Sequence, residues 1–432
     1  MFTGILILII FVIMAALMYL KKLPALLALP IMAVVIAVAG RAPVDDILRI
    51  VVAEGSIRLH KAIITVLFGA MLGQFIKESG IAETIVKKAA EFAGDRPFSV
   101  GLALAITSAL LFTVLGGLGA VIMVGTIVLP IMLSIGMPSI VAGCLFLLGL
   151  SLGGILNLTN WQLYITILRL KQTDILKFAL PLFFIFIGMT IAFLLIELKR
   201  QGKISLWAST SDPLGEKDVP YYALLTPVIP LILVLSFSLY NLIAKPAHPF
   251  EFPIISALVI GLIYGILTTW KREADKVNLI SKSIIEGTKN VMPAVVLMIG
   301  IGMVLNSVTH PMVSKAISPL ISQVMPKNPF TYVLLFAIFA PLALYRGPLN
   351  IWGMGSGLIA LMLVSRSIPA AAIMAAMLSV GQIQGVCDPT NTHNVWTANF
   401  LNINVQDILR RTIPYMWIVA VLGLIVGAVL YF

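Results

Sequence analysis

The chain has 432 residues, of which 60% are hydrophobic and only 11% are charged. A soluble domain carries about 25% charged residues, so this composition excludes an ordinary soluble protein and predicts a polytopic, all-α membrane protein. The net charge of +11 is better explained by basic cytoplasmic loops than by a nucleic-acid partner. Two cysteines inside apolar stretches argue against a disulfide framework or a zinc site.

A helix needs about 20 apolar residues to cross the hydrocarbon core, and that length predicts ten spans. They cover residues 3–20, 24–40, 60–77, 139–168, 176–198, 221–243, 252–270, 290–308, 370–400 and 412–431. Two further apolar stretches, 98–136 and 329–365, are interrupted by glycine-rich sequence, and each predicts either two spans or a re-entrant hairpin. The mixed-charge stretches 78–95 and 310–327 predict helices along the membrane interface.

The distribution of lysine and arginine predicts the orientation. If both interrupted stretches are hairpins, the ten spans place more of these residues on the face that holds the 201–220 linker. The positive-inside rule then puts this linker in the cytoplasm and both termini outside.

The second half of the sequence repeats the first at an offset near 230 residues. DRPF (95–98) matches KNPF (327–330), LSLGGI (150–155) matches LSVGQI (378–383), and DILKFALP (174–181) matches DILRRTIP (407–414). Chance similarity between hydrophobic sequences is the alternative. Five crossings plus one hairpin is an odd number of passes, so the second copy would be inverted. The predicted units are 1–200 with hairpin 98–136 and broken helix 139–168, the linker 201–220, and 221–432 with hairpin 329–365 and broken helix 370–400.

Each predicted repeat holds two interruptions at corresponding positions. Two are hairpin tips, TVLGGLGA (113–120) and YRGPLNIWG (345–353), and two are breaks in helices, GGILNLTNWQ (153–162) and GVCDPTNTHNVW (385–396). Irregular backbone at membrane depth is tolerated only where it lines a cavity or is buried in protein. Inverted repeats with interrupted helices are typical of secondary transporters, whose sites lie between the repeats near mid-membrane.

The interruptions supply the candidate site residues. Those predicted to bind substrate are Gly116, Gly117, Asn157, Thr159, Asn160, Arg346, Gly347, Asn350, Thr390, Asn391 and Thr392. Those predicted to bind a coupling ion are Asp388, Thr390, Asn391 and Asn157. Glycines let the backbone approach a ligand, while carbonyl, Thr and Asn oxygens suit Na⁺ and helix N-termini suit an anion.

Two charged residues stand out because charges inside a bilayer are costly. Arg346 could hold a carboxylate by two parallel hydrogen bonds; alternatively it pairs with Asp388 or lies at the water boundary. Asp388 could carry a coupling proton, ligate Na⁺, or cap the following half-helix. His393 is more often a hydrogen-bonding side chain than a proton carrier.

The sequence offers few motifs for catalysis or for ATP-driven transport. It holds no Walker loop and no H-E-x-x-H pair. We therefore expect neither an enzyme nor a cofactor, apart from Na⁺ as a coupling ion.

The stretch FGAMLGQFIKESGIAETIVKKAAEFAGDRPF (68–98) and the paired hairpin-plus-broken-helix plan resemble the ion transporter superfamily. Its citrate transporter-like and gluconate permease-like branch, related to the divalent anion/sodium symporters, is the most similar. Those symporters carry a Ser-Asn-Thr triplet at each tip, and the nearest match here is Thr390-Asn391-Thr392. The resemblance implies a homodimer in which an elevator-type transport domain slides against a scaffold domain, carrying organic anions with Na⁺ or H⁺.

Together these features predict a carrier in the inner (plasma) membrane that takes up a small organic carboxylate by H⁺- or Na⁺-coupled symport. The alternatives are a Na⁺/H⁺ antiporter or a metabolite exporter of the same superfamily. An ion channel or a membrane-embedded enzyme would be a different class, and neither a continuous polar stripe nor a catalytic set of residues supports them.

Overall fold

Apolar segments in a bilayer have to pair their own backbone polar groups, and a helix does so within one segment. The computed structural model describes residues 2–20, 22–200, 219–270, 275–352 and 355–432, with the backbone alone for Tyr19 and Arg346. Every regular element among these residues is a helix.

The chain up to the linker contains α1 (Phe2–Tyr19), α2 (Ala25–Ala39), α3 (Val44–Asp46), the π-helical η1 (Ile47–Glu54), α4 (Gly55–Ile57), α5 (His60–Glu78), α6 (Ile81–Ala93), α7 (Pro97–Phe112), α8 (Gly117–Ser134), α9 (Ser139–Ile155), α10 (Leu158–Leu168) and α11 (Gln172–Arg200). After it come η2 (Tyr221–Leu225), α12 (Ile229–Ala244), α13 (Ile254–Thr269), α14 (Lys276–Thr309), α15 (Pro311–Val324), α16 (Pro329–Phe339), η3 (Ala340–Arg346), α17 (Gly355–Ser365), α18 (Ala370–Cys387), α19 (Thr392–Phe400) and α20 (Val405–Tyr431).

In the described part of the chain, six helical runs are long and apolar enough to cross a membrane. They are Val44–Glu78, Gly117–Ser134, Gln172–Arg200, Lys276–Thr309, Ala370–Phe400 and Val405–Tyr431. Counting two bent pairs as one span each, α9 with α10 at 46° and the segments 311–324 and 329–345 at 94°, gives eight. The spans predicted at 3–20, 24–40, 221–243 and 252–270 coincide with shorter apolar helices, so a multi-pass helical protein is confirmed and the count of ten stays a prediction.

The predicted span 60–77 is too short, because the chain is already helical from Val44 and continues through α5 to Glu78. The predicted span 290–308 likewise forms only the second half of α14. Hydropathy missed these extensions because their polar side chains pair between the two long helices. Arg58 donates to Asn306 at 2.6 Å, and Lys282 lies 2.8 Å from Glu78.

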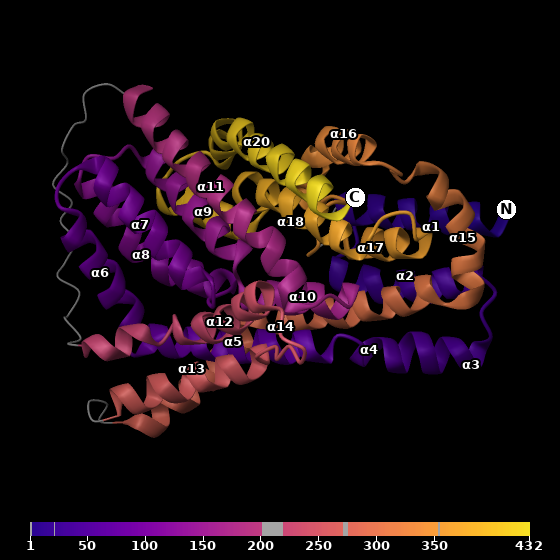
Figure 1. Ribbon diagram of the computed structural model, residues 1–432, viewed down its shortest axis with the longest axis horizontal. Coiled ribbons are helices and arrows are strands. Elements are labelled where there is room, and N and C mark those ends of the chain that lie inside the picture. Colours follow the sequence, from indigo (N-terminus) through magenta and orange to yellow (C-terminus); the bar gives the residue numbers. More distant parts are fainter. Residues whose placement is uncertain (1, 21, 201–218, 271–274, 353–354) are drawn as a thin grey trace.

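These two long helical runs pack side by side along one edge of the molecule (Figure 1). Glycines allow the close approach: a Cβ on Gly302 would lie 2.3 Å from the Gly55 carbonyl oxygen, and one on Gly287 would lie 2.7 Å from that of Ala70. Small residues at helix crossings are the usual means of tight packing in membranes. The two runs therefore form a closely packed wall beside the rest of the fold.

A second bundle, of α7, α9, α11, α18 and α20, packs across from this wall (Figure 1). A Cβ on Gly153 in α9 would lie 2.3 Å from the Ala109 carbonyl oxygen in α7, and one on Gly427 in α20 would lie 2.8 Å from the Ala375 side chain in α18. The broken helices α9–α10 and α18–α19 thus sit on closely packed supports.

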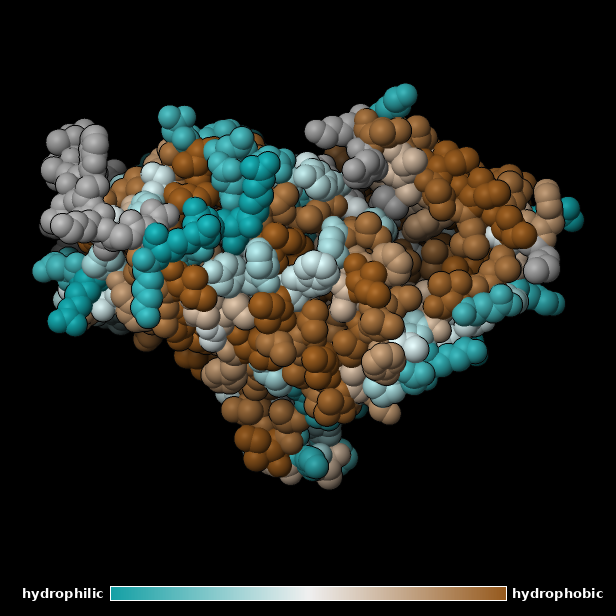
Figure 2. Space-filling model, turned by 90° about the horizontal axis from the view of Figure 1, so that it is seen from above, coloured by the Kyte–Doolittle hydropathy of each residue, from teal (hydrophilic) through white to brown (hydrophobic). Residues whose placement is uncertain are grey.

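The surface matches a bilayer setting. Figure 2 shows a broad hydrophobic surface, with hydrophilic groups gathered mainly toward the two ends of the long axis. The predicted orientation and the predicted units 1–200, 201–220 and 221–432 stay predictions, and residues 201–218 of the linker lie outside the described residues.

The α7–α9 contact predicts how stability responds to added volume. Replacing Gly153→Ala places a methyl group against the α7 backbone, and overpacking of this kind costs about 1–3 kcal/mol. The matched change Gly188→Ala in α11, where a Cβ would meet nothing within 4 Å, should be neutral or slightly stabilising because alanine favours helix. Thermal unfolding in detergent measures both, and equal midpoints would contradict the close packing.

Candidate functional site

The first helix break lies between α9 and α10 and is built around Asn157. Its Oδ1 accepts hydrogen bonds from the backbone N–H groups of Thr159 (3.0 Å) and Asn160 (3.1 Å), so it caps α10. Its Nδ2 donates to the carbonyl oxygens of Phe112 (2.8 Å) and Leu115 (3.1 Å) at the first hairpin tip. One buried amide thus joins a helix break to a tip.

The second break lies between α18 and α19 and combines a carboxylate with two asparagines. Asp388 is fully buried, and its Oδ1 accepts from the backbone N–H (2.8 Å) and hydroxyl (2.7 Å) of Thr390. Asn391 caps α19 by accepting from the His393 N–H at 3.3 Å. Asn394 donates to the carbonyl oxygens of Val386 (3.0 Å) and Asp388 (2.9 Å).

The two breaks share an Asn-x-x-Asn pattern, 157–160 and 391–394. The first asparagine caps the half-helix, and the second donates to a carbonyl oxygen six residues earlier: Asn160 to Gly154 at 3.1 Å, and Asn394 to Asp388. The side-chain oxygen of Asn394 is buried and has no hydrogen-bond partner among the described residues.

The first hairpin tip joins α7 to α8. Gly116 is extended, and Gly117 has φ +80°, a conformation that favours glycine. The tip meets α14 at Asn290, since a Cβ on Gly119 would lie 3.0 Å from Asn290 Nδ2.

The second tip follows α16 and η3. Tyr345 has φ +55°, and a Cβ on Gly347 would lie only 2.0 Å from the Leu342 carbonyl oxygen. Asn350 is buried; its Oδ1 accepts from the Trp352 N–H at 2.9 Å. The side chain of Arg346, the sharpest prediction from the sequence, lies outside the described residues.

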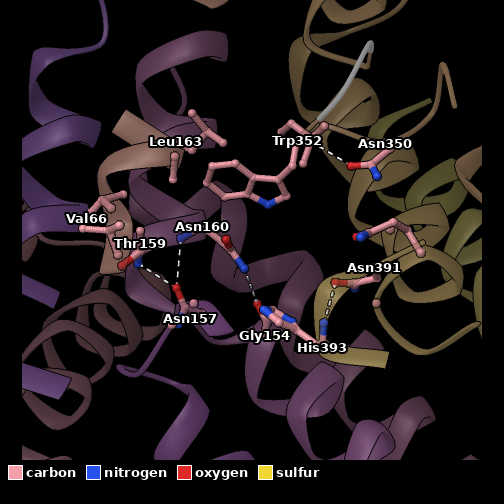
Figure 3. A pocket seen from close by; sticks show the side chains of 18 of the residues that line it. Val66, Gly154, Asn157, Thr159, Asn160, Leu163, Asn350, Trp352, Asn391 and His393 are labelled. Carbon is pink, nitrogen blue, oxygen red and sulfur yellow. Dashed lines mark hydrogen bonds between the residues drawn. The ribbon is translucent and has the colours of Figure 1, made fainter. Parts of the chain in front are cut away.

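These interruptions meet around a cavity of about 540 Å³. Of the predicted site residues, it is lined by Gly116, Gly117, Asn157, Thr159, Asn160, Asn350, Asp388, Asn391 and Thr392. Thr390 and Gly347 are not among its lining residues. Figure 3 shows the first break on one side of this space and Asn391 with His393 on the other, with the indole of Trp352 reaching between them.

Sequence reasoning missed several residues that line the cavity outside the interruptions, above all Asn290 in α14 and Gln382 and Gln384 in α18. Ser151 in α9 donates to Gln382 at 2.8 Å, which ties the two broken helices together. The LSLGGI/LSVGQI match was the available signal for this pair.

A string of hydrogen bonds leads from the cavity to the surface. Asn290 donates to Gln74 at 3.4 Å, Gln74 donates to Glu78 at 2.8 Å, and Lys282 donates to Glu78 at 2.8 Å. These residues belong to α5 and α14. The wall formed by the two long helical runs therefore holds the Asn290 amide in place against the first tip.

The described lining is mostly neutral. It contains one carboxylate, Asp388, and otherwise amides, hydroxyls, His393 and apolar side chains such as Leu163. Nowhere in the described ranges do three His, Cys, Asp or Glu side chains come together as a metal cluster. The arrangement can donate many hydrogen bonds to a small solute, and its oxygens next to Asp388 can accept a cation.

No protein-family model matches this sequence, and no curated protein matches it either. Among solved structures, the YdaH transporter of Alcanivorax borkumensis is similar, with a TM-score of 0.60, 15% identity and 85% of each chain covered. MtrF of Neisseria gonorrhoeae, from a class of antimetabolite efflux pumps, gives a TM-score of 0.57 and 14% identity over 90% of this chain and 83% of its own.

At these identities the likeness shows the fold. The chain shares its fold with these two transporter structures. The more specific branch predicted from the sequence, citrate transporter-like and gluconate permease-like, stays a prediction.

The double role of Asn157 predicts a large effect from a small change. Asn157→Asp keeps the oxygen that caps α10 but removes the donor, leaving two buried carbonyls unpaired at a cost of about 1–3 kcal/mol each. The matched change Asn328→Asp alters an exposed cap of α16, whose oxygen accepts from the Thr331 N–H at 2.9 Å. Thermal unfolding in detergent should show a loss for Asn157→Asp alone; equal losses would contradict the tip-to-break link.

Proposed function

We propose that this protein is a secondary active transporter that moves a small organic anion, such as citrate, a dicarboxylate or gluconate, together with H⁺ or Na⁺. The observation that carries the proposal is the cavity in which two hairpin tips and two Asn-capped helix breaks meet. A transporter needs a solute site that both sides of the membrane can reach in turn, and interrupted helices near mid-membrane are the usual way to build one.

Recognition of an anion is supported by the helix ends. The N-termini of α8, α10 and α19 all border the cavity, and their partial positive charge favours a carboxylate. Trp352 and Leu163 offer apolar surface for a carbon skeleton. Arg346 would supply the charge-assisted contact, as the sequence predicts.

Coupling to a cation is supported by the second break. Asp388 is buried beside the cavity, and the unpaired oxygen of Asn394 lies on the same helix break. Asp388, Thr390 and Asn391 would form the ion site. Asn157 could serve there only by giving up hydrogen bonds, since its Oδ1 already accepts two. A loaded, charge-compensated site would cross the membrane more readily than a half-loaded one.

In the proposed movement, the tips and broken helices travel as an elevator-type transport domain against the α5–α14 wall, in a homodimer. The packing supports such a division, because the tips touch the wall through residues such as Asn290 while the broken helices are bound to one another through Ser151 and Gln382.

A second candidate is export of a metabolite by antiport. The likeness to MtrF favours it, since that protein belongs to a class of efflux pumps. The same cavity would serve, with the cation entering as the solute leaves.

Uptake of radiolabelled citrate, succinate, gluconate and lactate into proteoliposomes tests the proposal. An inward Na⁺ or H⁺ gradient should drive accumulation of one anion. Arg346→Ala should weaken its apparent affinity roughly 10- to 100-fold, the worth of charged hydrogen bonds, and Asp388→Asn should abolish the gradient dependence. Arg49→Ala, at a side chain 77% exposed, is the matched control.

The direction of the gradient separates the two candidates. Accumulation driven by an outward cation gradient would favour export by antiport over symport. Cation exchange without movement of any anion would contradict both, and the same breaks would then have to be a cation site.

A further inference from the structure

A second hollow lies where α11 ends and α20 begins, away from the tips. Its volume is about 730 Å³. The described residues that line it are Ile140, Glu197, Arg200, Asn402, Ile403, Asn404, Asp407, Arg410, Arg411, Pro414 and Tyr415. Three arginines face two carboxylates, so the described lining has an excess of positive charge.

One ion pair in this hollow is built into the fold. Glu197 is 1% exposed, and Arg411 donates to its Oε2. The hydroxyl of Tyr415 lies 3.3 Å from Glu197 Oε1. Breaking a buried pair leaves an unpaired charge, which is strongly destabilising, so Glu197 and Arg411 hold α11 against α20 and fix the shape of the hollow.

The other two arginines have capacity to bind a ligand. Arg200 is 68% exposed and lies 3.9 Å from Glu197, while Arg410 is 81% exposed and lies 3.8 Å from Asp407. The Arg410–Asp407 contact joins two exposed groups and contributes little, and Glu197 keeps its shorter contact with Arg411 when Arg200 turns away. Because the guanidinium group matches phosphate with two parallel hydrogen bonds, both side chains can turn to an anion at no large cost.

The position of the hollow relative to the bilayer indicates which class of anion it binds. Helices α11 and α20 have 29 and 27 residues, or about 40 Å at 1.5 Å per residue, which exceeds the hydrocarbon core of about 30 Å. Their polar ends therefore reach the headgroup layer. Ile140, Ile403 and Pro414 provide apolar wall beside the arginines, as an acyl chain attached to the anion would require.

We propose that this hollow binds the phosphate of an anionic phospholipid headgroup, with Arg200 and Arg410 as ligands. The N-terminus of α20, capped by Asn404 at 2.8 Å from the Gln406 N–H, adds a favourable partial charge. A lipid held between α11 and α20 would stabilise α20, which packs against the broken helix α18. The lipid composition of the bilayer would therefore affect the helices that line the cavity.

Native mass spectrometry of the detergent-solubilised protein tests this site. Dioleoyl phosphatidylglycerol should bind more tightly than dioleoyl phosphatidylcholine, and the double change Arg200→Gln/Arg410→Gln should remove the difference. A basic side chain near an anionic lipid is worth roughly fivefold in binding, so the loss should exceed tenfold. Arg49→Gln, also exposed and paired with a carboxylate four residues away, should leave binding unchanged.

Three outcomes would overturn the assignment. Equal binding of the two lipids, or an equal loss in Arg49→Gln, would mean that the hollow does not select an anionic headgroup. Tight binding of the deacylated headgroup glycerophosphoglycerol would show that the site takes a soluble phosphate ester. Glu197 and Arg411 stay unchanged in every variant, so a folding defect does not confuse the result.

Discussion

Backbone N–H and carbonyl groups cannot be left unpaired at membrane depth, and each break in a membrane helix exposes several of them. This chain meets the constraint with asparagines at each break, of which Asn157 and Asn394 are buried. Asn157 and Asn391 cap the half-helices α10 and α19, and Asn160 and Asn394 return to carbonyls on the preceding side of each break. These hydrogen bonds stabilise the irregular backbone of the breaks, and the polar groups that remain face a cavity instead of lipid.

The arrangement of the tips and broken helices at the candidate site depends on these hydrogen bonds. Since Asn157 also bonds to the first tip, the tip cannot move independently of its broken helix, and Ser151 links that helix to α18 through Gln382. The opposing wall of α5 and α14 is held by glycine contacts and meets the first tip at Asn290, and it also packs against α10 and α17.

The sequence alone predicted the helical class, the location of the interruptions and the cavity residues that lie at them, such as Asn157 and Asp388, because glycine, proline and asparagine clustered inside apolar sequence disfavour a continuous helix. The prediction from sequence failed where tertiary contacts determine the local structure. The helical extensions at 44–59 and 276–289 were not predicted, since polar residues such as Arg58 and Lys282 find partners across the contact between the two long helical runs. Asn290 and Gln384 lie within the regular helices α14 and α18, where nothing in a local pattern distinguishes a cavity residue from a lipid-facing one.

The central claim is that the cavity holds the transported solute, and labelling of a cysteine in its wall tests it directly. Gly381 lines the cavity, and a Cβ there meets nothing within 4 Å; the native Cys144 and Cys387 are buried. In Gly381→Cys, a transported anion should slow reaction with a maleimide, whereas Gln323→Cys at the end of α15 should react at an unchanged rate. Unchanged labelling of Gly381→Cys at anion concentrations that saturate uptake would contradict the account.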